Sequence, residues 1–141
     1  MKIYFACSIT GGREFETSYQ QIVAALSADG HEIPTSHLAQ SETMEAERIL
    51  NARYIYERDV NWIKECDALI AEVSTPSHGV GYEIAFALSL GKPVLCIHQK
   101  GRNVSKMLTG NPHPALIVKS YSNLDEMISQ ARAFVKEKTY L

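Results

Sequence analysis

The stretch Ala68-Leu69-Ile70-Ala71-Glu72-Val73 is the clearest strand in the sequence. A short, mostly apolar run of this kind, ending at a turn signal, is typical of a strand that is buried on both faces of a sheet. A polar loop, residues 74–78, follows it and leads into Gly79-Val80-Gly81-Tyr82-Glu83, where we expect a helix that runs to about Leu90. A strand, a loop and a helix in this order form the repeating unit of parallel sheets.

The same unit recurs on both sides of this stretch. We expect further strands at residues 2–7, 32–35, 94–97 and 115–118, and helices at about 15–26, 44–64 and 124–135. In the helix at 44–64 one apolar face is formed by Ile49, Ala52, Tyr56, Val60 and Ile63. Together these elements predict one α/β domain over residues 1–141: a flavodoxin-like (Rossmann-like) five-stranded parallel sheet with helices on both faces. Ligands of such sheets bind beyond the carboxyl ends of the strands.

The composition narrows the class of partner. The chain has 141 residues, 45% of them hydrophobic, and a formal net charge of −2. This charge gives no sign of a basic face for long nucleic acid, whereas a phosphorylated small molecule needs only a local group of donors. No apolar run is long enough to span a membrane, and the N-terminus has no signal-peptide pattern. We therefore expect a cytoplasmic protein, or a nuclear one in a eukaryote, without a membrane partner.

Several residue types are present without the spacing that their usual chemistry needs. The three cysteines form no CxxC pair and are expected to be reduced and buried. The five histidines show no metal-ligand spacing, and the sequence contains no GxSxG nucleophile motif. The sequence therefore predicts neither a metal nor a cofactor.

The loop after the first strand, Ser8-Ile9-Thr10-Gly11-Gly12-Arg13, has the features of an anion site. Its glycines permit a close approach of the backbone, and the helix that follows offers free N–H groups. The hydroxyls and the arginine add donors suited to a phosphate. The loop matches neither the P-loop nor the dinucleotide fingerprint. An ordinary glycine-containing turn with a surface arginine explains it equally well.

Two carboxylates are candidates for chemistry. Glu83, expected in the first turn of its helix, has no cation three or four residues further on, although a glutamate there is also explained by the helix dipole. Asp59 lies at the edge of an apolar stripe, and no residue at i±3 or i±4 is cationic, which favours a raised pKa. The alternative for Asp59 is a rim residue that reaches water or another element.

These segments resemble a known family. The segment from Tyr4 to Glu14 is similar to the first motif of the 2′-deoxynucleoside 5′-phosphate N-hydrolases, which belong to the nucleoside 2-deoxyribosyltransferase superfamily. The segment from Asp59 to Glu83 resembles the second motif, including the separation of the two acids, and Gly101-Arg102-Asn103-Val104-Ser105 resembles a third. The resemblance spans nearly the whole chain.

The resemblance implies a reaction and the residues that perform it. Glu83 is the expected nucleophile toward C1′ of the deoxyribose, through a glycosyl-enzyme ester, with Asp59 as acid/base and Tyr4 beside the nucleophile. Ser105 is expected to reach the phosphate from the neighbouring subunit of a homodimer. Residues that match substrate-binding positions are Ser8, Ile9, Thr10, Gly11, Gly12, Arg13, Ser77 and Gly79.

One departure from the family concerns Thr10, because mammalian members have arginine at this position. Threonine donates one hydrogen bond but no charged fork, so phosphate affinity or base preference is expected to differ. The enzymatic alternatives are deoxyribosyl transfer to a second base and hydrolysis of a ribonucleotide such as a cytidine monophosphate. A non-catalytic nucleotide-binding regulatory module on the same fold is the alternative outside enzymes.

Overall fold

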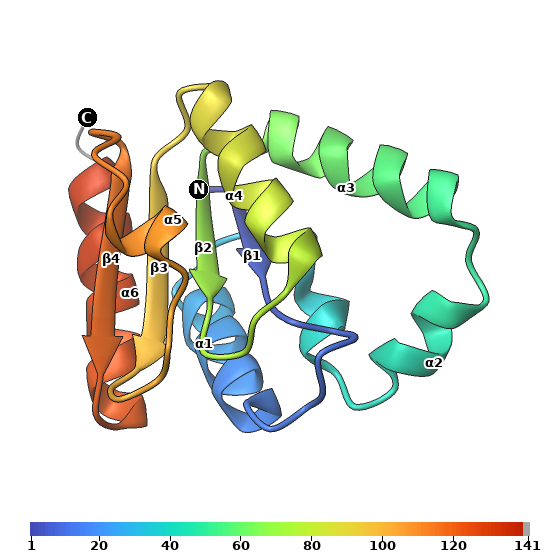
Figure 1. Ribbon diagram of the computed structural model, residues 1–141, viewed down its shortest axis with the longest axis horizontal. Coiled ribbons are helices and arrows are strands. Elements are labelled where there is room, and N and C mark those ends of the chain that lie inside the picture. Colours follow the sequence, from blue (N-terminus) through green and yellow to red (C-terminus); the bar gives the residue numbers. More distant parts are fainter. Residues whose placement is uncertain (140–141) are drawn as a thin grey trace.

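The computed structural model describes residues 1–139 and shows a parallel four-stranded sheet (Figure 1). Its strands are β1 (Ile3–Ala6), β2 (Ala68–Glu72), β3 (Val94–Gln99) and β4 (Leu116–Tyr121), and they lie in this order across the sheet. In the register, Ile3 pairs with Ala68 and Leu69 with Val94. The parallel sheet with alternating helices agrees with the sequence prediction.

The predicted fifth strand is wrong. Of residues 32–35, only Glu32 takes part in the sheet, through an isolated parallel bridge to Lys2 at the edge of β1. Pro34 follows at once, and a proline has no N–H to continue a ladder. Thr35 instead donates its hydroxyl to the Phe5 carbonyl and accepts from the Phe5 N–H, so a side chain pairs with β1 where a strand was expected.

Helices cover both faces of the sheet, as expected. On one face, α1 (Glu16–Ala28) and α6 (Leu124–Thr139) pack against Ile3, Phe5 and the matching residues of the other strands. On the other face, α3 (Ala52–Glu65) and α4 (His78–Ser89) pack against Tyr4, Ala6 and their neighbours. Successive strand residues point to opposite faces, so Tyr4 faces the layer formed by α3 and α4.

The expected helix at 44–64 is two helices. A short 3-10 helix, η1 (Ser36–Ala39), precedes α2 (Thr43–Arg48), and the chain turns before α3 begins. Asn51 causes the break, because its side chain accepts a hydrogen bond from the Tyr54 N–H and caps the new helix. Ile49, Ala52 and Tyr56 are consequently exposed instead of buried, and only Val60 and Ile63 of the predicted apolar face enter the core.

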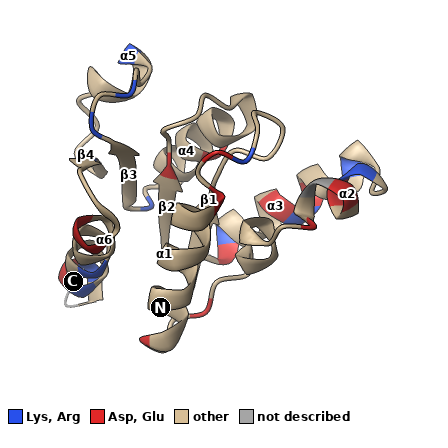
Figure 2. Ribbon diagram, turned by 90° about the horizontal axis from the view of Figure 1, so that it is seen from below, with Lys and Arg blue, Asp and Glu red and all other residues tan. Residues whose placement is uncertain are grey.

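The remaining helix, α5 (Lys106–Thr109), is a single turn in the segment between β3 and β4. Figures 1 and 2 both place α5 and α3 on opposite sides of α4. Among the described residues, no helix has both the length and the apolar character needed to cross a membrane. The three cysteines are free thiols and are buried, as predicted.

Candidate active site

Helix α4 places Glu83 beside the carboxyl end of the sheet. Ser77 ends the loop after β2 and caps α4, because its hydroxyl accepts a hydrogen bond from the Val80 N–H at 3.3 Å. The helix begins at His78, so Glu83 lies in its second turn and not in the first turn as the sequence suggested. The helix dipole acts mainly on the terminal turn, so it does not explain a glutamate at this position.

Tyr4 is the hydrogen-bond partner of Glu83. This buried tyrosine reaches up from β1 and donates its hydroxyl to Oε2 of the carboxylate. Within residues 1–139 no cation forms an ion pair with Glu83, and burial raises the pKa of the Glu83 carboxyl to about 8. The second oxygen, Oε1, lies on the side of Gly79, where an added Cβ would be 3.9 Å from it and 3.9 Å from the Ser77 hydroxyl.

The raised pKa of Glu83 makes a prediction about stability. The unfolded chain releases this proton near pH 4.5, whereas the folded chain keeps it up to about pH 8. Stability therefore falls as the pH rises through this window. We expect Glu83→Gln, which has no such proton to lose, to stabilise the fold by about 3.5 kcal/mol more at pH 8 than at pH 5.

Urea unfolding of the Glu83→Gln variant at the two pH values measures this difference. Glu57→Gln makes the same chemical change at an exposed position of α3 and serves as the control. An equal effect of Glu83→Gln at both pH values would contradict the burial of an uncompensated carboxylate.

Asp59 has a cationic partner that the helix-spacing rule did not consider. Arg58, its neighbour in sequence, donates from Nε to Oδ1 of Asp59 at 2.9 Å. The prediction that Asp59 lacks a local partner is therefore wrong. The predicted direction of its pKa is nevertheless confirmed: burial raises the pKa of Asp59, although Arg58 acts in the opposite direction.

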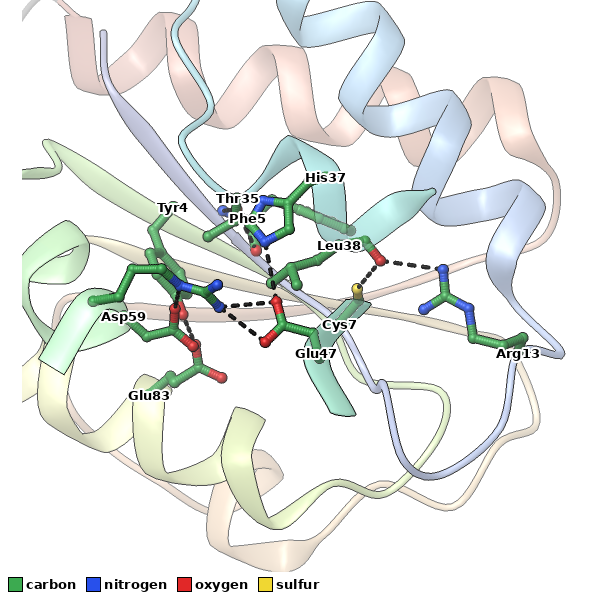
Figure 3. A network of polar contacts seen from close by, with 11 residues as sticks. Tyr4, Phe5, Cys7, Arg13, Thr35, His37, Leu38, Glu47, Asp59 and Glu83 are labelled. Atoms are coloured by element: carbon green, nitrogen blue, oxygen red, sulfur yellow. Dashed lines mark hydrogen bonds and ion pairs between the residues drawn. The ribbon is translucent and has the colours of Figure 1, made fainter. Parts of the chain in front are cut away.

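The three predicted catalytic side chains converge, as Figure 3 shows. Asp59 reaches in from α3 and Glu83 from α4, and their carboxylates are seen together at the end of the Tyr4 side chain. The rings of Tyr56 on α3 and Tyr82 on α4 contact each other, with their centroids 6.2 Å apart. Elements distant along the sequence therefore bring two acids and a phenol to one place.

The loop after β1 lies beside the loop before α4. A Cβ on Gly11 would meet the Ser8 hydroxyl at 2.5 Å, the Thr75 side chain at 3.0 Å and the Pro76 carbonyl at 3.1 Å, so only glycine fits. Gly12 has a φ of 103°, which a side chain disfavours. Ser8 is buried, and its hydroxyl accepts from the Gly11 N–H. The glycines thus allow the loop after β1 to approach the loop before α4 closely.

Arg13 does not present a free guanidinium. It donates to the main-chain carbonyls of Leu38 and Gln40 at 3.1 and 3.0 Å, and it forms an ion pair with Glu16. In this conformation the Arg13 guanidinium is therefore, contrary to the prediction, not free to bind phosphate with two parallel hydrogen bonds. Instead, Arg13 connects the loop after β1 to the segment at the end of η1. The main-chain N–H groups of Thr10, Gly12 and Arg13 donate to no other described residue. Thr10 is exposed and Ile9 is half-buried against the α1 and α6 core.

Ser105 lies away from the two acids of its own chain. It caps α5 by accepting from the Met107 N–H at 3.2 Å, and it lines a largely apolar cavity of about 570 Å³ between α4 and the segment around α5. Neither Glu83 nor Asp59 lines this cavity.

Sequence reasoning missed three residues near Asp59, namely Arg58, Glu47 and His37. Arg58 is bound on its far side by Glu47 of α2, and Glu47 in turn contacts His37 of η1. A cation adjacent in sequence to the candidate acid was a usable signal for Arg58. Glu47 had no such signal, because its approach depends on the turn between α2 and α3.

Comparison with known proteins matches residues 3–135 to the family model described as nucleoside 2-deoxyribosyltransferase. The chain belongs to this family. A relative in Methanococcoides burtonii, named as a 2′-deoxynucleoside 5′-phosphate N-hydrolase, is 43% identical over 119 residues, which cover 84% of this chain and 98% of the relative. The 5-hydroxymethyl-dUMP N-hydrolase of Rattus norvegicus is 42% identical over 112 residues, covering 77% and 68%.

A solved structure supports the fold of this family member. The CMP N-glycosidase BcmB of Clostridium botulinum superimposes with a TM-score of 0.72 at 18% identity, over 95% of this chain and 99% of that one. At this identity the similarity concerns the fold alone. The prediction of the family from its two principal motifs is confirmed by the family model and the relatives.

Proposed function

We propose that this family member hydrolyses the N-glycosidic bond of 2′-deoxynucleoside 5′-monophosphates and releases the free base and 2-deoxyribose 5-phosphate. The observation that carries the proposal is the half-buried Glu83 carboxyl, which no ion pair satisfies among residues 1–139. It accepts a hydrogen bond from Tyr4 and faces the same region as Asp59. A site that only binds an anionic nucleotide gains nothing from two acids at this place. The names of the relatives agree with the substrate class.

In the first step Glu83 attacks C1′ of the deoxyribose as a carboxylate, after it has released to solvent the proton that burial favours. The bond from C1′ to the base nitrogen breaks. Oε1 is the attacking oxygen, because Tyr4 occupies Oε2 whereas Oε1 accepts no hydrogen bond from the described residues. The departing base takes the bonding electrons and receives a proton from Asp59 in its acid form. The product of this step is a glycosyl ester of Glu83.

In the second step water replaces the ester. Asp59, now a carboxylate, takes a proton from water, the hydroxyl adds to C1′, and Glu83 leaves as a carboxylate. Tyr4 stabilises this leaving carboxylate with its hydroxyl. The sum is one water consumed for each base released.

The 5′-phosphate is held by the two neighbouring loops. Ser77 presents a hydroxyl there that accepts one main-chain hydrogen bond, so its own proton is free to donate to phosphate. Ser8 is fully buried in this structure, so it reaches the phosphate only if the loop shifts, and otherwise it shapes the loop by accepting from the Gly11 N–H. The main-chain N–H groups around Gly12 add donors. Arg13 contributes by keeping the loop in place and not as a charged fork.

Chromatographic detection of free base from a panel of nucleotides tests the function. The panel varies the sugar, deoxyribose against ribose, and the presence of the 5′-phosphate. We expect fast release only from deoxynucleoside 5′-monophosphates. Faster release from cytidine 5′-monophosphate would favour ribonucleotide hydrolysis, and formation of a new nucleotide from an added second base would favour transfer. No release from any member of the panel would contradict the function.

A homodimer with shared sites is part of the proposal. Large apolar side chains are exposed on this chain, among them Ile49, Tyr54, Tyr82 and, at 81%, Met107 next to Ser105. Ser105 lines one cavity with Ser77 of its own chain, whereas neither acid lines it, so the role of Ser105 toward a second copy rests on the resemblance of residues 101–105 to the third motif of the family.

Mixing two defective variants tests this arrangement. Ser105→Ala and Glu83→Gln subunits, once exchanged, form hybrids that contain one intact site if Ser105 acts across the interface. Random exchange then gives activity in about a quarter of the sites, well above the sum of the two variants measured separately. No gain after exchange has been verified by mass spectrometry would contradict a shared site.

A further inference from the structure

Arg58 lies between two carboxylates that come from different helices. Its Nη2 donates to both oxygens of Glu47, at 3.0 and 3.2 Å, and its Nε donates to Oδ1 of Asp59 at 2.9 Å. Its guanidinium also lies over the ring of Trp62, with Cζ 4.9 Å from the ring centroid. In Figure 3 Glu47, Asp59 and Glu83 lie near one another, and the hydrogen bonds place the Arg58 guanidinium between Glu47 and Asp59.

The row is sheltered from solvent. The exposed fractions of the Glu47, Arg58 and Asp59 side chains are 10%, 13% and 20%. An exposed pair on the same helix provides a comparison, because Arg53 and Glu57 are 3.0 Å apart but their side chains are 88% and 57% exposed. Exposed pairs of this kind contribute little to stability. A guanidinium that is sheltered from solvent and donates to two carboxylates has one preferred orientation.

We propose that Arg58 is a positioning residue for Asp59, and that Glu47 of α2 positions Arg58. The inference rests on the proposed function, since it assigns the acid/base role to Asp59. One oxygen of Asp59 is held by Arg58, and the other accepts no hydrogen bond from the described residues, so it is the oxygen that can exchange a proton with the base or with water. Reacting groups held in this way need little reorganisation in the transition state.

The arrangement makes the segment from η1 to α2 part of the active site. His37 of η1 contacts Glu47 at 3.1 Å and lies edge-on to Trp62. The turn at residues 49–51 brings α2 back to α3, and Glu47 reaches Arg58 there. Substrate does not need to touch Glu47 for this glutamate to affect the rate.

Two substitutions separate positioning from a general loss of structure. Arg58→Lys keeps the charge but not the fork, and Glu47→Gln keeps the shape but not the charge. Arg53→Lys and Glu57→Gln, the same changes at the exposed pair, are the matched controls. We expect kcat for base release to fall about 10–100-fold in Arg58→Lys and several-fold in Glu47→Gln, with KM nearly unchanged. The controls stay close to the wild type.

The pH profile gives a signature that a structural role does not. The charged and titratable groups around Asp59 are Arg58, Glu47, His37, Glu83 and Tyr4. Among them Arg58 lowers the pKa of Asp59 and Glu47 raises it. The limb of the profile that depends on Asp59 should therefore move to higher pH in Arg58→Met and to lower pH in Glu47→Gln.

The outcomes are distinguishable. Rates of Arg58→Lys and Glu47→Gln equal to those of their controls, with Asp59→Asn inactive, overturn the positioning and leave the function intact. A rise in KM with unchanged kcat also overturns it, because Arg58 then binds substrate. If the wild type releases no base, the function fails. In that case an NMR titration of Asp59, labelled at its carboxyl carbon, still tests the contact with Arg58. It can be carried out on the wild type and on Glu47→Gln if Arg58→Met does not fold.

Discussion

Replacement of Glu83 with glutamine is expected to reduce the rate of base release by about 10⁴-fold or more, because the amide does not attack C1′. No other acid among the described residues accepts a hydrogen bond from Tyr4 and could replace Glu83. Glutamine keeps the volume of the side chain and can still accept the hydrogen bond from Tyr4, so the site keeps its shape. Affinity for the nucleotide should therefore remain measurable by calorimetry. The change then appears in kcat and not in the dissociation constant.

The control for this experiment is Glu57→Gln, which should show wild-type turnover. Turnover of Glu83→Gln within a factor of about ten of the wild type would remove Glu83 as the nucleophile. Loss of nucleotide affinity together with turnover would instead indicate that Glu83 serves binding.

Asp59→Asn is expected to lower the rate by about 10²–10³-fold, in the range of a lost general acid/base. The asparagine oxygen can still accept from Arg58, so the fold around α3 should persist. The loss should be smallest for nucleotides whose base leaves readily without a proton, because these need the acid least. Measured against pH, kcat/KM of the variant should lack the limb that depends on Asp59. An unchanged profile, or an equal loss for every leaving group, would take Asp59 out of the proton transfer.

The sequence predicted the sheet and the position of the acids well, for identifiable reasons. The buried strands are short apolar runs. Three of them, β1, β2 and β4, are followed by a helix with an apolar face, and a local sequence pattern is enough to recognise both features. Alternation along β1 likewise allows Tyr4 to face α4. The order of elements then brings Asp59 and Glu83 to one end of the sheet.

What the sequence did not reveal depends on contacts between distant segments. The apolar spacing continues from Ile49 into α3, so the break capped by Asn51 was hidden within a regular pattern. Arg13 was expected at the phosphate because nothing local shows that carbonyls of residues 38 and 40 would engage it. Glu47 and Arg58 meet only after the chain has turned back on itself.

The two-residue period of β1 has a consequence for how activity can be lost without loss of fold. A slip of β1 by one position against β2 would turn Phe5 toward α4 and Tyr4 toward α1. The two aromatic rings are nearly equal in size, yet only one carries a hydroxyl. A one-residue shift in register would therefore leave a well-packed but inactive protein, because the Tyr4 hydroxyl would lie on the face of the sheet opposite Glu83.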